Sequence, residues 1–222
     1  TYDKQTSYPY KRDMLNRALF NKLHKKMAIG FNTRIYNETA PTDYDSQVFS
    51  ISKDTFFKGN WQTEKYFKNY RDELLNRIIP KESSNNSVET LINEISKVES
   101  VSIHVRRGDY VQIGCNLGMD YYDTAIQIIL NKYNDAVFYI FSDDTEFCKS
   151  WFAKYIGKLD IRYPEYESTN TTVDDLWIMS NCKHNIIANS SFSWWAAWLN
   201  QNSQKLVVCP ELGMWANEFY PE

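Results

Sequence analysis

Five short apolar runs alternate with helix-like stretches in the second half of the chain. The apolar runs cover 101–105, 136–141, 160–163, 185–188 and 205–209. The helix-like stretches cover 121–133, 145–156, 173–181 and 192–201. Nearly continuous apolar runs separated by helices are typical of parallel strands that are buried on both faces. The pattern therefore predicts an α/β fold, with a Rossmann-like, doubly wound parallel sheet in the C-terminal half.

The first hundred residues carry a weaker pattern, in which only helices stand out. Apolar residues at helical spacing favour a helix over 13–27, whereas residues 30–50 look irregular. A second helix is expected from Thr63, a candidate N-cap, to Ile78, because the following Pro80 would end it. A third short helix is expected over 88–98.

A polar stretch over 81–87 (K-E-S-S-N-N-S) lies between these two regions. Clusters of serine, asparagine and charged residues are typical of loops between packed units. The 222 residues suffice for one large domain or two small ones. We therefore expect a partial N-terminal domain with a helical linker over 1–85, and a second, Rossmann-like domain over 86–222.

The stretch over 101–111 (V-S-I-H-V-R-R-G-D-Y-V) carries the first candidate chemistry. Its alternation predicts a short strand that ends at Gly108, so Arg106 and Arg107 would lie at the carboxyl end of that strand. An arginine there can grip a phosphate with its planar fork of donors. His104 lies on the polar face of the strand, where it could brace Arg106 or touch a phosphate or a sugar. The alternative is a strand end closed by solvated charges.

Polar clusters follow three of the predicted strands. Arg106 follows the first strand, Asp143 and Asp144 follow the second, and the segment 189–193 (N-S-S-F-S) follows the fourth. The carboxyl ends of parallel strands meet at one edge of the sheet, which is where such folds bind ligands. This coincidence predicts a nucleoside diphosphate site.

Each cluster also has a structural alternative. Asp143 or Asp144 could accept two N–H groups of guanine, or could simply favour the positive end of a helix dipole. Ser190 and Ser191 could receive a phosphate at a helix start, or one of them could be only an N-cap. No G-x-G-x-x-G or P-loop motif is present, so a dinucleotide fold and a P-loop ATPase are excluded.

Composition narrows the function further. The net charge of −3 disfavours a nucleic-acid-binding protein, which would need a basic stripe. Four widely spaced cysteines without a C-x-x-C pair favour a reduced, intracellular compartment. Asp43-Tyr44-Asp45 resembles a D-x-D metal motif, but its turn-like context favours a loop, and no metal site is expected. His184 is expected to be structural, and Trp194, Trp195 and Trp198 are expected to pack in the core.

Four motifs together resemble a known family. They are W-Q-T-E-K-Y-F (61–67), H-V-R-R-G-D-Y (104–110), F-S-D-D (141–144) and the run D-L-W-I-M-S-N-C-K-H-N-I-I-A-N-S-S-F-S-W-W-A-A-W-L-N (175–200). In this order they are similar to the α-1,2-fucosyltransferases of glycosyltransferase family eleven. The resemblance implies a GT-B-like fold of two Rossmann-like halves. It also implies an inverting transfer of L-fucose from GDP-fucose, the co-substrate, without a cofactor or an essential metal.

The resemblance also implies roles for single residues. Arg106 would grip the donor pyrophosphate with His104 beside it, and Asp143 or Asp144 would read guanine. The donor site would be completed on the β-phosphate side by Asn189, Ser190, Ser191, Phe192 and Ser193. Asp109 is the nearest candidate for the catalytic base, although it could only hold the turn.

The chain departs from the family at its beginning. Members open with a strand and a G-G-L-G-N-Q-M-F-Q-like loop, and this sequence has neither. We therefore expect an incomplete N-terminal, acceptor-side domain. Two rival interpretations stay open: a non-catalytic GDP-sugar or carbohydrate-binding protein, and a fucosyltransferase of different linkage, such as α-1,6.

The acceptor and the location are expectations of the same kind. The expected acceptor is an oligosaccharide or polysaccharide that ends in galactose, with transfer to its O2. No apolar run is long enough to span a bilayer, and no signal peptide is visible. With the Lys- and Asn-rich composition, this favours a bacterial protein of the cytoplasm, at the inner face of the membrane through peripheral association.

Overall fold

The computed structural model describes residues 34–38, 44–78, 86–167 and 171–211. The helix expected over 13–27 lies outside these residues, as do Pro80 and most of the polar stretch 81–87. The chain divides into two compact units, Thr1–Tyr66 and Phe67–Glu222. The second unit contains the parallel sheet.

This sheet confirms the predicted α/β class. Its strands are β3 Ser100–Val105, β4 Val137–Ser142, β5 Asp160–Arg162, β6 His184–Ile186 and β7 Val207–Val208. They lie in the order β5-β4-β3-β6-β7, and every neighbouring pair is parallel. The strand order reverses between β3 and β6, which is where doubly wound sheets open a binding crevice.

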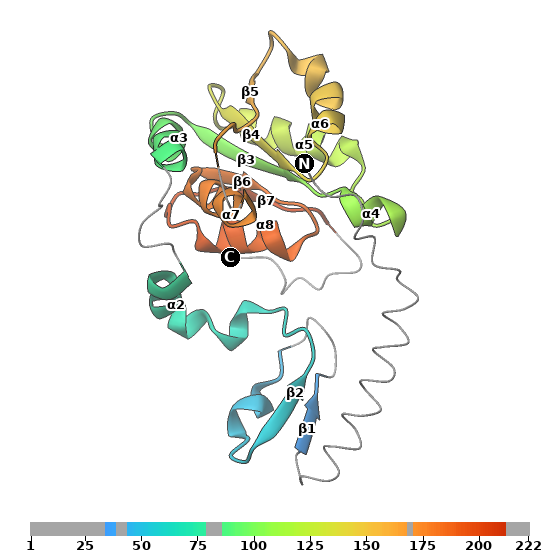
Figure 1. Ribbon diagram of the computed structural model, residues 1–222, viewed down its shortest axis with the longest axis vertical. Coiled ribbons are helices and arrows are strands. Elements are labelled where there is room, and N and C mark those ends of the chain that lie inside the picture. Colours follow the sequence, from blue (N-terminus) through green and yellow to red (C-terminus); the bar gives the residue numbers. More distant parts are fainter. Residues whose placement is uncertain (1–33, 39–43, 79–85, 168–170, 212–222) are drawn as a thin grey trace. The chain divides into compact units, whose positions relative to one another are not determined.

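Helices cover both faces of the sheet (Figure 1). The α-helices described in this unit are α2 Arg71–Ile78, α3 Asn86–Ser96, α4 Gly108–Gln112, α5 Met119–Leu130, α6 Thr145–Phe152, α7 Thr171–Asn181 and α8 Ser191–Leu199. α5 and α6 pack on the face that carries Val101, Ile103 and Val105. α3, α7 and α8 pack on the opposite face, where Tyr139 and Phe141 of β4 are buried. Full burial of each such side chain contributes ~1.5–3 kcal/mol, so these two layers account for much of the stability of the fold.

The helix expected over 63–78 is interrupted, so that prediction is wrong in its first half. Two 3-10 turns, η2 Glu64–Tyr66 and η3 Lys68–Tyr70, precede α2 Arg71–Ile78. Phe67 separates the turns with φ −140° and ψ 0°. Its ring stacks on Trp195 of α8, with 5.4 Å between ring centroids. The packing of this ring outweighs the local helical preference.

Along the chain, the division between the two units falls between Tyr66 and Phe67, whereas the sequence placed a domain boundary at 85/86. Phe67, Leu74 and Leu75 pack on the aromatic cluster of α8, so α2 belongs to the second unit and is not a linker. Trp194 and Trp198 are buried in that cluster, and Trp195 packs against it, which confirms them as core residues. The roles expected for the two domains stay predictions.

The first unit contains a pair of short parallel strands. One of them lies in the segment 30–50, which was expected to be irregular. β1 Arg34–Asn37 pairs with β2 Thr55–Lys58, and η1 Ser46–Ser50 lies between them in the chain. Trp61 has a φ of 53°, an unusual value for a residue with a side chain. The Glu38 carboxylate accepts its backbone N–H at 2.9 Å and thereby holds this conformation.

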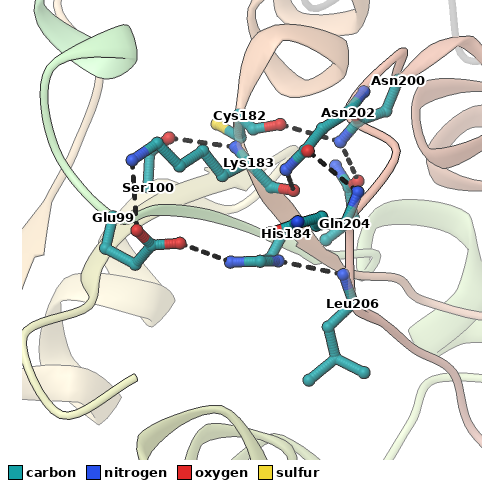
Figure 2. A network of polar contacts seen from close by, with 10 residues as sticks. Glu99, Ser100, Cys182, Lys183, His184, Asn200, Asn202, Gln204 and Leu206 are labelled. Carbon is teal, nitrogen blue, oxygen red and sulfur yellow. Dashed lines mark hydrogen bonds and ion pairs between the residues drawn. The ribbon is translucent and has the colours of Figure 1, made fainter. Parts of the chain in front are cut away.

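A polar network joins β3, β6 and the chain before β7 at the amino ends of the strands (Figure 2). His184 Nδ1 accepts the Leu206 N–H at 2.9 Å, so the neutral ring carries its proton on Nε2. Nε2 lies 2.6 Å from Glu99 Oε1, to which it donates. Lys183 Nζ contacts the second carboxylate oxygen, Glu99 Oε2, at 3.1 Å. The prediction that His184 is structural is confirmed.

Asparagine side chains extend this network towards the end of α8 (Figure 2). Asn200 Nδ2 donates to the Cys182 carbonyl at 2.7 Å and to Asn185 Oδ1 at 2.8 Å. Asn202 Nδ2 donates to the Lys183 carbonyl at 3.0 Å. Backbone groups that the short strand β6 leaves unpaired are satisfied in this way.

Candidate functional site

The carboxyl ends of β4, β3 and β6 bring the three predicted polar clusters to one edge of the sheet. These strands are neighbours in the sheet, so Ser142–Asp144, Arg106 and Asn189–Ser193 follow adjacent strand ends. Ser142 Oγ donates to the Val105 carbonyl at 2.7 Å, which ties the ends of β4 and β3 together. The edge lies at the reversal of strand order, where a ligand site is expected.

Arg106 is held between two carboxylates. Its Nη1 lies 2.8 Å from Asp143 Oδ2, and its Nη2 lies 2.7 Å from Asp109 Oδ1. The guanidinium carbon lies 5.4 Å from the centroid of the Tyr110 ring. A third of the Arg106 side chain is exposed, so the fork has fixed partners and still faces solvent. Arg106 is therefore preorganised to receive an anionic group.

Arg107 faces a different element from Arg106. Its Nε lies 3.1 Å from Asp144 Oδ2, and its guanidinium carbon lies 3.3 Å from the centroid of the Phe147 ring. Its backbone N–H donates to Asp143 Oδ1 at 2.9 Å. The sequence placed this arginine with Arg106 at the end of the strand but gave only Arg106 a role in the donor site.

Gly108 allows the close approach of these groups. A Cβ atom at this position would lie 2.5 Å from Asp143 Oδ2. The sequence predicted a sharp turn here, whereas Gly108 begins the short helix α4. The glycine is thus required by the carboxylate beside it and not by a left-handed backbone.

The two aspartates after β4 are already engaged. Asp143 accepts hydrogen bonds from Arg106 and from the Arg107 backbone. Asp144 pairs with Arg107 and caps α6 by accepting the Phe147 N–H at 3.2 Å. The helix-start alternative for Asp144 is therefore confirmed. Guanine reading by either residue stays a prediction, and a base bound there would have to share these oxygens with the arginines.

His104 is buried beside α8. It is 6% exposed, and its ring centroid lies 5.4 Å from that of Phe192. Burial, helped by the nearby Arg106 charge, lowers the pKa of His104 to about 3, so the ring is neutral. Its Nδ1 is buried and has no hydrogen-bond partner within the described residues. Tyr122 of α5 holds the His104 backbone by donating to its carbonyl at 3.1 Å.

Three serines lie at the start of α8, and each has a different environment. Ser190 is the N-cap and accepts the Phe192 N–H at 3.4 Å, which confirms the N-cap alternative. Ser193 is buried and accepts the Ala188 N–H at 3.1 Å, so it locks the turn between β6 and α8. Ser191 is the exposed serine of the three. Only its hydroxyl is open to a ligand in this conformation.

Asn189 links this turn to the loop that follows α4. Its Nδ2 donates to the Cys115 carbonyl at 2.8 Å, and its Oδ1 is buried without a hydrogen-bond partner in the described part of the chain. The side chain is 5% exposed. Asn189 therefore positions the loop after α4 beside the strand ends.

The metal motif considered in the sequence does not form a site in the described residues. Asp43 lies outside them, and Asp45 caps η1 by accepting the Gln47 N–H at 2.9 Å. Within the described ranges, no three His, Cys, Asp or Glu side chains are grouped as a metal ion requires. Cys115, Cys148, Cys182 and Cys209 are free thiols. No helix in the described residues has the length and apolar character to cross a membrane.

Comparisons with known proteins agree with one another. The chain matches glycosyl transferase family 11 over residues 12–219. It is 37% identical over 161 residues to an alpha-1,2-colitosyltransferase of Escherichia coli, covering 69% of this chain and 54% of that protein. It is 29% identical over 105 residues to galactoside 2-alpha-L-fucosyltransferase Sec1 of Mus musculus, covering 45% of this chain and 28% of that protein. The matched part thus spans about half or less of these relatives.

A similarity to solved structures is weaker. POFUT1 in complex with GDP superposes with a TM-score of 0.46 at 12% identity, covering 70% of this chain and 55% of that one. The arrangement of two halves that a GT-B fold requires stays a prediction.

Proposed function

The chain belongs to glycosyl transferase family 11, and on this premise we propose that it transfers L-fucose from GDP-fucose to a hydroxyl of a glycan. We further propose that the acceptor ends in galactose and that its O2 is the nucleophile, which gives an α-1,2 linkage. The names of an alpha-1,2-colitosyltransferase and a galactoside 2-alpha-L-fucosyltransferase among the relatives support this linkage.

The observation that carries the proposal is the placement of Arg106. Its fork is held by Asp143 and Asp109 at the carboxyl end of β3, beside the strand ends where nucleotides bind in such sheets. A diphosphate that docks here would meet the outward N–H groups of this fork. It would also lie near the start of α8, where the N-terminal amides and the exposed Ser191 hydroxyl favour an anion.

In the proposed reaction, the acceptor hydroxyl attacks C1 of fucose from the face opposite GDP. The new C1–O bond forms while the bond from C1 to the β-phosphate oxygen breaks, so the configuration at C1 inverts. The electron pair of the broken bond stays on GDP, and Arg106 stabilises that charge in place of a metal ion. A preorganised donor of this kind contributes about 10²–10³ in rate.

The proton of the acceptor hydroxyl needs a base. Asp109 is our candidate, because its carboxylate is exposed at the same edge of the sheet as Arg106, and it would act on an acceptor hydroxyl that lies on the face of fucose opposite GDP. It would have to release the Arg106 contact, at least in part, to accept the proton. His104 is less suited to this task, because it is buried and its low pKa makes it a weak base.

A second candidate donor follows from one relative. The alpha-1,2-colitosyltransferase is 37% identical to this chain, so a GDP-linked colitose is the alternative sugar. Both sugars would use the same nucleotide contacts. Rates with GDP-fucose and GDP-colitose at equal concentration distinguish them, and we expect GDP-fucose to react faster.

The test is thermal stabilisation of the chain by GDP-fucose, compared with GDP, ADP and UDP, with and without a chelator. We expect stabilisation by the two guanine nucleotides alone, unchanged by the chelator. At a ligand concentration 100 times Kd, binding stabilises by about 2.7 kcal/mol, which is readily measured. Stabilisation by all three nucleoside diphosphates alike, or only without chelator, would contradict the donor assignment or its independence of metal.

Product analysis then separates the rival interpretations. Binding of GDP-fucose without turnover on any galactoside would leave a non-catalytic GDP-sugar binder. Turnover with a product linked at another position would identify a fucosyltransferase of different linkage. We expect transfer to O2 of terminal galactose.

A further inference from the structure

Arg107 lies beside the candidate donor site, but its side chain contacts other residues than that of Arg106. Every side-chain contact described above for Arg107 is to the start of α6, where it pairs with Asp144 and covers the Phe147 ring. Its side chain is 19% exposed, against 33% for Arg106. A guanidinium that contacts an aromatic ring and also pairs with a carboxylate is held in one orientation.

Arg107 contacts the turn after β4 through both its side chain and its backbone. Asp144 accepts from Arg107 Nε, while the neighbouring Asp143 accepts the Arg107 backbone N–H at 2.9 Å. Asp144 is fixed further because its own N–H donates to Ser142 Oγ at 3.0 Å. The turn is thus held on one side by β3 and on the other by α6.

This turn sets the direction of Arg106. Asp143 Oδ2 receives Arg106 Nη1 at 2.8 Å, so any rotation of the 142–144 turn moves a partner of the Arg106 fork. Gly108 lets Asp143 lie this close to α4, because a Cβ atom at that position would be only 2.5 Å from Asp143 Oδ2. The chain of contacts therefore runs from Phe147 and Arg107, through Asp144 and Asp143, to Arg106.

We propose that Arg107 is a positioning residue, which fixes the 142–144 turn and thereby aims Arg106 at the donor diphosphate, without contacting the nucleotide itself. This inference rests on the proposed function, because it assigns Arg107 a part in the same donor site. In this account Arg107 holds the 142–144 turn in place, and Arg106 binds the phosphate.

The test is a double-mutant cycle between Arg107 and Asp144, with GDP as the probe. The variants are Arg107→Ala, Asp144→Asn and the double variant, because asparagine keeps the N-cap of α6 and removes only the charge. The dissociation constants of GDP and of guanosine are measured by calorimetry or competition, and each variant is checked by thermal melting. Lys149→Ala is the matched control, since Lys149 pairs with Glu146 on the outer surface of the same helix.

Each single variant should raise the Kd of GDP by about fivefold to tenfold, and the double variant by no more than the worse single one, as expected for residues in one network. The Kd of guanosine should change by less than twofold, since it has no phosphate for Arg106 to grip. The control should bind GDP like the wild type.

Three results would overturn the proposal. One is a double variant whose loss is the product of the two single losses. Another is a loss with Arg107→Ala but none with Asp144→Asn, as a direct phosphate contact requires. The third is an equal loss for guanosine and GDP with Arg107→Ala, which would indicate general disruption of the site; an equal loss with Asp144→Asn alone would instead assign Asp144 to the guanine base and overturn its part in the network. If the wild-type chain itself bound no GDP, the proposed function would fail first and this inference with it.

Discussion

At the scale of single residues, the candidate site depends on Arg106. Both of its terminal nitrogens have carboxylate partners, at 2.8 Å from Asp143 and 2.7 Å from Asp109. We expect Arg106→Ala to reduce transfer by about 10²–10³, because a preorganised donor to the leaving group is lost. The rate of product formation from GDP-fucose at saturating acceptor measures this effect.

The control for that variant is Arg77→Ala. Arg77 lies on α2 with 73% of its side chain exposed and pairs with Glu73 one helical turn earlier. The same chemical change there should leave transfer unchanged. Near-normal turnover by Arg106→Ala would remove Arg106 from the site.

Removing the Asp109 charge is expected to strengthen GDP binding and to slow turnover. The cluster holds two arginines against Asp109, Asp143 and Asp144, so an incoming diphosphate meets an excess of negative charge. Asp109 is 64% exposed and competes with the phosphate for Arg106. An exposed pair contributes ~1 kcal/mol or less, so Asp109→Asn should lower the Kd of GDP by about twofold to fivefold. Turnover should nevertheless fall, because the candidate base is lost.

Calorimetry with GDP and steady-state kinetics separate these two effects. A higher Kd for GDP in Asp109→Asn would mean that this carboxylate orients Arg106 and does not compete with the ligand. An unchanged turnover number would move the catalytic base to another residue.

A substitution at Gly108 tests the geometry of the Asp143–Arg106 contact without removing a charge. A methyl group at this position would lie 2.5 Å from Asp143 Oδ2, so the carboxylate must move and its contact with Arg106 must lengthen. We expect Gly108→Ala to weaken GDP binding by about tenfold, a loss of ~1.4 kcal/mol. The melting temperature should change little, because α4 is short and partly exposed. Wild-type affinity for GDP would contradict this account.

The sequence predicted which residues meet at this edge but not how they pair. Strand ends could be located from the apolar runs, and parallel strands bring their ends together, so Arg106, Asp143 and Ser190 were expected at one edge, and they do follow adjacent strands. The pairing of Arg107 with Asp144 spans 37 positions in the chain and depends on the direction of each side chain. Sequence spacing carries no information on that direction.

At the scale of elements, prediction succeeded where burial alone decides the structure. The strands β3 and β4 and the helices around them are specified by nearly continuous apolar residues, and they were placed to within a few positions. β1 and α4 were missed, because each is short and partly exposed and carries no periodic pattern. The break at Phe67 was missed because its cause, the stack on Trp195, is a contact across 128 positions.

The network at the amino ends of the strands supplies a prediction at this scale. Glu99 connects β3 to β6, because it accepts from the His184 ring at 2.6 Å and from Lys183 at 3.1 Å. Its loss leaves the Nε2–H group of His184, which is 2% exposed, without a partner. We expect Glu99→Ala to destabilise the fold by about 1–3 kcal/mol in urea denaturation. Glu94→Ala, on the exposed face of α3, is the control and should cost under about 0.5 kcal/mol. Equal effects of the two variants would make the network irrelevant to stability.

At the scale of the whole molecule, two buried histidines make stability depend on pH. Burial, together with the nearby Arg106 charge, lowers the pKa of His104 from 6.5 to about 3. Burial also lowers the pKa of His184, although the Glu99 carboxylate opposes this shift and Lys132 and Lys183 add to it. Protonation of His184 would also turn its Nδ1 into a donor that faces the Leu206 N–H. Both rings are therefore neutral in the folded chain at neutral pH.

The sign of the effect follows from proton binding. Below the ordinary histidine pKa of 6.5, the unfolded chain takes up protons that the folded chain refuses, so unfolding becomes more favourable as pH falls. Each such histidine costs up to ~1.4 kcal/mol per pH unit, from 6.5 downward until its folded pKa is reached, which for His104 is about 3. We expect the free energy of unfolding in urea to be constant from pH 8 to 7 and to fall between pH 6.5 and 5. His104→Gln should flatten that slope, because it removes the buried ring whose pKa is lowered to about 3. Stability that stays level from pH 7 to 5 in the wild type would mean that these rings gain protons in the folded chain as readily as in the unfolded one.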